Sequence, residues 1–181
     1  MANYFLDTEF EKISRTLISI AIVREDGKYL YLVMRDAIDM LRRAPITTKL
    51  STDLRNNIPA TSEDANRLWL MENVLRNLAI ADGIEGWHAD KAEAWKNLEQ
   101  FFYGDTDIII HSDWPSDPEY FCALITDTTG RMVPGLEDVA FKVHANATPW
   151  PCPVEGAVQH NAYWDAVALA YALTGNDIAL G

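Results

Sequence analysis

The chain has 181 residues, of which 49% are hydrophobic and 23% charged, and this size and composition favour one compact domain over two. Its net charge of −12 argues against a protein that grips long nucleic acids by phosphate neutralisation, because that mode needs clustered lysines and arginines and the sequence has no basic run. An acidic enzyme of nucleic acids is expected to act on strand ends or short single strands, with metal ions as its local positive charge.

The predicted elements alternate between strands and helices. Strands are predicted at 4–7, 17–24 and 29–34, with a hairpin at Asp26-Gly27 between the last two. A helix follows from a capping box at Thr61 and Asp64 to Asp82-Gly83, and a second helix starts at about Asp90. A strand is then predicted within 107–111, and a helix runs from an Asp117 cap and Pro118 to Ile125. The remaining elements are a loop with one short strand over 134–159 and a helix over 162–173. This order predicts an α/β fold with a mixed central sheet in a single domain, residues 1–181.

The N-terminal residues and the cysteines indicate the expected compartment. The segment that begins at Met1 has no basic region followed by a long apolar stretch, so we predict no signal peptide, no membrane span and a cytoplasmic location. Cys122 and Cys152 lack the spacing of a zinc site. Reduced thiols are expected, with a disulfide as the alternative.

Asp7 and Glu9 are the first candidates for chemistry, and we predict that they stand where an apolar strand ends. Side chains two apart on a strand share one face, so both carboxylates point the same way. Their repulsion is relieved if a divalent cation such as Mg²⁺ or Mn²⁺ lies between them. The alternative is a solvated strand end.

Asp165 lies within the apolar stripe of the final predicted helix, three residues after Ala162 and four before Leu169. An unpaired buried carboxylate is costly, so Asp165 is expected to face a metal or, as the alternative, an arginine or lysine.

His160 precedes Asp165 by five positions and meets it only if His160 belongs to the loop before the helix, with Asn161 as the cap. A histidine there suits a base that takes a proton from water near neutral pH. An ordinary surface histidine is the alternative, and we prefer that interpretation for His88, His111 and His144.

The third carboxylate is either Asp113 or Asp117, both of which follow the apolar strand at 107–111. Asp117 has a structural explanation as a helix cap, but a capping Asp can also face a cleft. We favour Asp117 as the ligand.

These motifs, in order, resemble the histidine branch of the DEDD 3′-to-5′ exonuclease superfamily. The closer likeness is to small bacterial exoribonucleases typified by the polyadenylate-specific RNase AS. It is carried by Tyr4-Phe5-Leu6-Asp7-Thr8-Glu9-Phe10, Leu17-Ile18-Ser19-Ile20, Glu25-Asp26-Gly27 and His160-x4-Asp165. The middle motif departs from the family, since Trp114-Pro115-Ser116 stands where an Asn or Gly and often an aromatic residue precede the Asp.

The resemblance implies an RNase H-like fold in which Asp7, Glu9, Asp117 and Asp165 hold two Mg²⁺ or Mn²⁺ ions and His160 acts as the base. The implied reaction is hydrolysis of single strands from the 3′ end to nucleoside 5′-monophosphates, with RNA favoured over DNA. The resemblance also favours a homodimer.

Aromatic residues near the motifs are candidates for stacking on terminal bases. We predict substrate contacts from Thr8, Phe10 and Trp114. A DNA exonuclease of the same superfamily, a non-catalytic binding domain and a coincidental pattern on an unrelated acidic protein are the competing interpretations.

Overall fold

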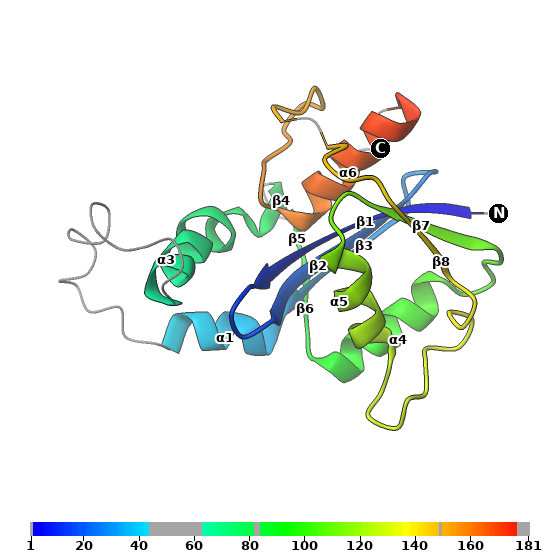
Figure 1. Cartoon of the computed structure of the whole chain (residues 1–181), viewed down its shortest axis with the longest axis horizontal. Helices are drawn as coiled ribbons and strands as arrows, with labels where there is room; N and C mark the ends of the chain where they lie inside the picture. Colours follow the sequence, from blue (N-terminus) through cyan, green and yellow to red (C-terminus); the bar gives the residue numbers. More distant parts are fainter. Residues whose placement is uncertain (1, 44–62, 82–83, 149, 177–181) are drawn as a thin grey trace.

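One mixed β-sheet with helices on both faces organises the chain in the computed structural model, which describes residues 2–43, 63–81, 84–148 and 150–176 (Figure 1). The elements in order are β1 Ala2–Glu11, β2 Thr16–Arg24, β3 Tyr29–Met34, α1 Arg35–Arg43, α3 Glu63–Asn73, the 3-10 helix η1 Leu75–Asn77, β4 Ala79–Ala81, β5 Ile84–Glu85, β6 Trp87–Ala89, α4 Lys91–Phe101, β7 Ile108–Ser112, α5 Ser116–Ile125, β8 Ala140–Val143 and α6 Ala162–Thr174. The predicted α/β class and mixed sheet are confirmed.

The six strands of the main sheet lie in the order β6-β3-β2-β1-β7-β8. Strand β1 pairs antiparallel with β2 and parallel with β7, and so lies inside the sheet. The predicted hairpin between β2 and β3 is confirmed, with Gly27 at a φ of 88° that favours glycine in the turn.

Alternating side chains of β1 face opposite layers. Tyr4 and Leu6 pack with residues of α4 and α5, whereas Phe5 packs with α6. Residues of α1, α3 and α6 together cover one face through a second apolar cluster with β2 and β3. Because side chains alternate along a strand, Asp7 and Glu9 share the face of Phe5 and are directed toward α6.

Two predicted boundaries differ from the structure. Strand β1 continues to Glu11 because β2 pairs with it as far as Thr16. The helix predicted to run past Leu78 ends at Asn73, where Val74 is buried in the core and a short 3-10 helix follows. Thr61 and Asp82-Gly83 lie outside the described residues, as does the side chain of Asp64.

Helix caps account for the boundaries of α4 and α6. Asp90 forms a capping box with Glu93, as expected for a helix that starts near Asp90. Asn161 caps α6 by accepting hydrogen bonds from two backbone amides, and Gly175 ends that helix in the left-handed region. None of the helices in the described ranges has the length and apolar character needed to cross a membrane.

Candidate metal centre

Asp7 and Glu9 lie within β1, so the prediction that they stand at a strand end is wrong. Asp7 pairs with Ala21 of β2 and Glu9 with Ser19, and the register shifts directly after Glu9. Both side chains are half-buried. The strand therefore holds the two carboxylates in fixed positions on the face covered by α6, as the two-residue spacing predicted.

Asp165 completes a first group of carboxylates with Asp7 and Glu9, in which one oxygen of each residue lies within 4.8 Å of the others. Its position depends on the cap of α6, because the Asn161 backbone N–H donates to Asp165 Oδ2 at 3.1 Å. Among the described residues, no lysine or arginine forms a salt bridge with Asp165. In the described part of the chain, Asp165 thus has carboxylates as its charged neighbours and no cationic side chain paired with it.

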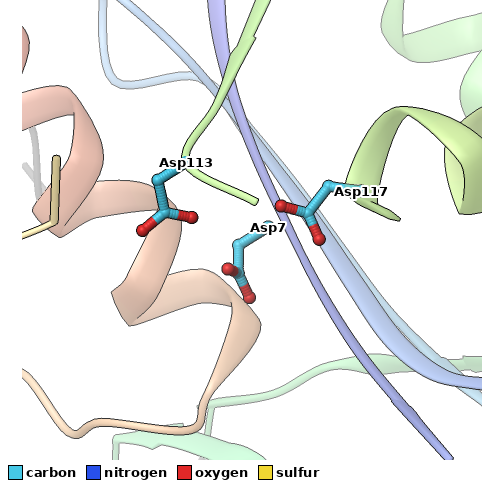
Figure 2. A group of neighbouring side chains, drawn as sticks. All are labelled: Asp7, Asp113 and Asp117. Atoms are coloured by element: carbon cyan, nitrogen blue, oxygen red, sulfur yellow. The ribbon is translucent and has the colours of Figure 1, made fainter. Parts of the chain in front are cut away.

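Asp113 and Asp117 form a second group with Asp7, also within 4.8 Å (Figure 2). Figure 2 shows Asp7 on β1, Asp113 on the segment after β7 and Asp117 at the start of α5, with their carboxyl groups gathered around one space. Both candidates for the third carboxylate therefore lie next to Asp7, which is the residue common to the two groups.

Asp117 does not cap α5, and that prediction is wrong. The helix begins one residue earlier, at Ser116, and Pro115 occupies the cap position without a side-chain bond. Asp117 is instead 1% exposed, and its Oδ1 accepts a hydrogen bond of 2.6 Å from the Thr8 hydroxyl. Its Oδ2 is buried without a hydrogen-bond partner in the described structure. A buried carboxylate oxygen left unpaired is costly unless a cation approaches it.

Asp113 is half-buried, and its Oδ2 accepts a hydrogen bond from the Thr148 hydroxyl. Thr148 belongs to the loop before α6, so this bond connects that loop to the segment that follows β7. Nothing in the sequence pattern marked Thr148, because its role depends on how the loop over 134–159 folds back.

The carboxylates raise one another's pKa values. Burial and then the charges of Asp165 and Asp117 raise the pKa values of Asp7 and Glu9 well above their usual range. Burial also raises the pKa of Asp117 to about 7 and that of Asp165 to about 7, with Asp113 adding to both shifts. The site therefore gathers carboxylates whose negative charges repel one another, and no salt bridge to a described lysine or arginine offsets this repulsion.

This donor set fits divalent cations. Mg²⁺ and Mn²⁺ prefer carboxylate oxygens, and Mg²⁺ binds through one or two carboxylates while keeping other positions for water and phosphate oxygens. Two groups that share Asp7 suit two neighbouring ions, and the Asp117 Oδ2 atom has no hydrogen bond in the described structure that would compete with an ion.

The raised pKa values predict that the metal-free protein loses stability as the pH rises from about 5 to about 7. Asp165 has a pKa of about 7 in the fold against 3.8 unfolded, so the folded chain binds a proton that the unfolded chain has released. At about 1.4 kcal/mol per pKa unit, the free energy of unfolding should fall by an amount on the order of 2 kcal/mol over this pH range. Thermal unfolding in EDTA across this range measures it.

Mg²⁺ should reverse this loss, and its stabilising effect should be largest at the upper end of the pH range. Asp165→Asn should flatten the pH dependence of the melting temperature in EDTA. A melting temperature that rises from about pH 5 to about pH 7 without metal would contradict the charge cluster as the source.

His160 belongs to neither carboxylate group, and its link to the first group is a backbone hydrogen bond to the Asp165 carboxylate. Its φ of 62° places the backbone in the left-handed region directly before the α6 cap, as predicted for a residue of the preceding loop. Its ring packs edge-on against Trp69, with ring centroids 4.8 Å apart. Burial, together with the charge of Lys12, lowers the pKa of His160 below its usual 6.5, which favours the neutral form of the ring.

The three residues predicted to contact substrate occupy different environments. Thr8 is buried and donates to Asp117, which makes it a residue that orients a carboxylate. Phe10 stacks on Tyr120 with centroids 4.4 Å apart, and Trp114 is 53% exposed between Asp113 and α5. Substrate contact by these residues stays a prediction.

Lys12 and Trp69 also belong to the surroundings of the site, although the sequence did not mark either as functional. Lys12 lies one residue beyond β1, and Trp69 comes from α3, far along the chain. Only the packing of α3 beside the end of β1 brings them together.

Neither comparison with known proteins finds a relative: no protein-family model matches the chain, and no curated protein matches it.

Proposed function

We propose that the protein is a metal-dependent 3′-to-5′ exonuclease that acts on single-stranded ends, RNA before DNA, and releases nucleoside 5′-monophosphates. The observation that carries the proposal is the pair of carboxylate groups that share Asp7. The mixed sheet with helices on both faces is consistent with the RNase H-like fold that the sequence resemblance implies, and we include that fold in the proposal.

Asp7, Glu9 and Asp165 would hold one divalent cation, and Asp7 with Asp117 the other, with Asp113 beside them as a supporting carboxylate. When bound, such a pair of ions polarises the scissile phosphate, activates water and stabilises the leaving oxygen. Thr8 keeps the Asp117 carboxylate in place through its hydroxyl.

His160 supplies the step that the carboxylates cannot perform while they ligate ions. A ring nitrogen of neutral His160 takes a proton from the water whose oxygen attacks phosphorus. The bond from phosphorus to the 3′ oxygen of the preceding nucleotide breaks, and that oxygen takes a proton from solvent water to become a hydroxyl. The phosphate stays on the released terminal nucleotide.

The charge distribution supports action on ends. A protein with 15 basic and 27 acidic residues cannot neutralise many phosphates along a strand, so its affinity has to come from the few positions around the metal centre. The preference for RNA rests on the sequence resemblance alone.

The test is digestion of matched 5′-labelled RNA and DNA single strands with Mg²⁺ or Mn²⁺, with EDTA, and with the Asp7→Ala variant. We expect a ladder that shortens from the 3′ end on RNA and is absent from both controls. Shortening of DNA alone would identify an exodeoxyribonuclease instead. Strand binding without cleavage in either metal would favour a non-catalytic domain, and the absence of saturable Mn²⁺ binding would contradict the metal centre itself.

Asp113 and Asp117 should differ in their importance. Asp117 is buried with one free oxygen, so Asp117→Asn removes a direct ligand and should lower the rate constant of cleavage by about 10³-fold, since a metal ion supplies several kcal/mol of charge stabilisation. Asp113 is half-buried and bound to Thr148, so Asp113→Asn should cost about 10- to 100-fold, as for a supporting residue. Single-turnover kinetics of the two variants compare them; equal losses would contradict this ranking.

A further inference from the structure

A hollow of about 320 Å³ opens beside His160, and it is lined by Lys12, Ala65, Asn66 and Trp69. It lies between the end of β1 and helix α3. Because Trp69 also packs against the ring of His160, the hollow adjoins the side of the site where the proposed base stands. Its volume is in the range of small-molecule sites, roughly 300 to 1,000 Å³.

Lys12 brings a positive charge to the rim of this hollow. Its side chain is exposed, and it forms no hydrogen bond or ion pair with any residue that the structure describes. Its charge partly offsets the rise in the pKa of Glu9, which burial causes in the main, and it adds to burial in lowering the pKa of His160. The ammonium thus lies where its charge acts on both residues, and it is exposed to an incoming anion.

Trp69 contributes an aromatic surface to the same hollow. It is 41% exposed although it contacts His160, so a large part of the indole remains open to solvent. Asn66 is held in place from the other side, because its amide nitrogen donates to Glu11 of β1. The hollow thus combines a flat apolar surface, an unpaired cation and a fixed polar wall.

We propose that this hollow is the subsite for the terminal nucleotide of the strand, with its base on the Trp69 indole and its phosphate near Lys12. The proposal rests on the nuclease function given above. Stacking on an aromatic ring accepts every base, and a lysine binds phosphate as a point charge, so the two residues together recognise a nucleotide without reading its sequence. They also explain how an acidic protein holds an anionic strand end next to its carboxylates.

The probe is 5′-AMP, whose binding in Mg²⁺ is measured by calorimetry for the wild type, Trp69→Ala and Lys12→Ala. Trp69→Ala should weaken binding by about 10-fold or more, the loss expected for one stacked base. Lys12→Ala should weaken binding and reduce the slope of log affinity against log salt by about one, which a purely structural role would not do. Trp87→Ala and Lys96→Ala are matched controls on the exposed surfaces of β6 and α4 and should bind like the wild type.

Trp69→Phe should restore most of the AMP affinity, because the smaller ring still stacks. If Trp69→Ala fails to fold, Trp69→Phe and Lys12→Ala decide the question. Unchanged AMP affinity in Lys12→Ala together with an unchanged salt slope would overturn the subsite, as would a loss of affinity in Trp114→Ala that equals or exceeds the loss in Trp69→Ala.

Strand cleavage separates this proposal from the nuclease proposal. If the wild type shortens RNA and both variants keep its KM, the subsite is wrong and the nuclease function stands. If the wild type binds AMP through Trp69 and Lys12 but cleaves no strand, the subsite stands and the nuclease function fails. If both proposals hold, the two variants raise KM more than they lower kcat.

Discussion

Replacing Asp7 with asparagine is expected to reduce strand cleavage by about 10³-fold or more, because metal ions supply several kcal/mol of transition-state stabilisation and each 1.36 kcal/mol corresponds to tenfold in rate. Asp7 is the only residue present in both carboxylate groups of the described structure, so one substitution weakens both cation sites. Single-turnover cleavage of a 3′-end substrate at saturating Mg²⁺ measures the loss. Calorimetric Mn²⁺ titration should show reduced affinity in parallel.

The same substitution should not harm the fold. Asparagine is nearly the same size as aspartate, and removing one charge relieves the repulsion that raises the pKa values of the cluster. The melting temperature of Asp7→Asn in EDTA should therefore equal or exceed that of the wild type. Asp138→Asn, an exposed carboxylate before β8, is the matched control and should keep full activity. Retained cleavage by Asp7→Asn would remove the basis of the metal-centre proposal.

Replacing His160 with alanine is expected to lower kcat by about 10²- to 10⁴-fold, the usual contribution of a general base. The wild type should gain activity as the pH rises through the pKa of His160, because the base works only when deprotonated. Burial and Lys12 lower this pKa below the usual 6.5, so the acidic limb of the profile should lie below that value.

The pH profile distinguishes a base from a structural residue. In His160→Ala the limb due to this histidine should disappear, while metal affinity and the melting temperature should stay close to those of the wild type. His88→Ala, at an exposed histidine of β6, is the matched control and should retain both the rate and the limb. An unchanged profile in His160→Ala would assign the proton transfer to another group.

Much of the fold was predictable from local chemistry. The Asp26-Gly27 hairpin, the Asp90 capping box and the Asn161 cap are each formed by residues close together in the chain, so the sequence alone determines them. The end of helix α3 at Asn73 was not predictable in this way, because the burial of Val74 depends on contacts with distant elements.

Some features of the candidate site were likewise predictable from the sequence, and others were not. The sequence by itself determined that Asp7 and Glu9 share a face of a strand, because that follows from the two-residue repeat of extended chain. Whether Asp113 or Asp117 lies beside Asp7 was decided by the tertiary structure, which brings both there.

Tertiary structure alone also created the surroundings of the candidate metal centre. Thr148 reaches Asp113, and Trp69 reaches His160, across long stretches of chain that no local pattern connects. Local rules of spacing and capping act over a few residues, whereas burial, charge repulsion and unpaired oxygens depend on which distant segments pack together. For that reason the sequence by itself determined the types of residues available for chemistry, and only the packing of β1, α5, α6 and α3 decided how they meet.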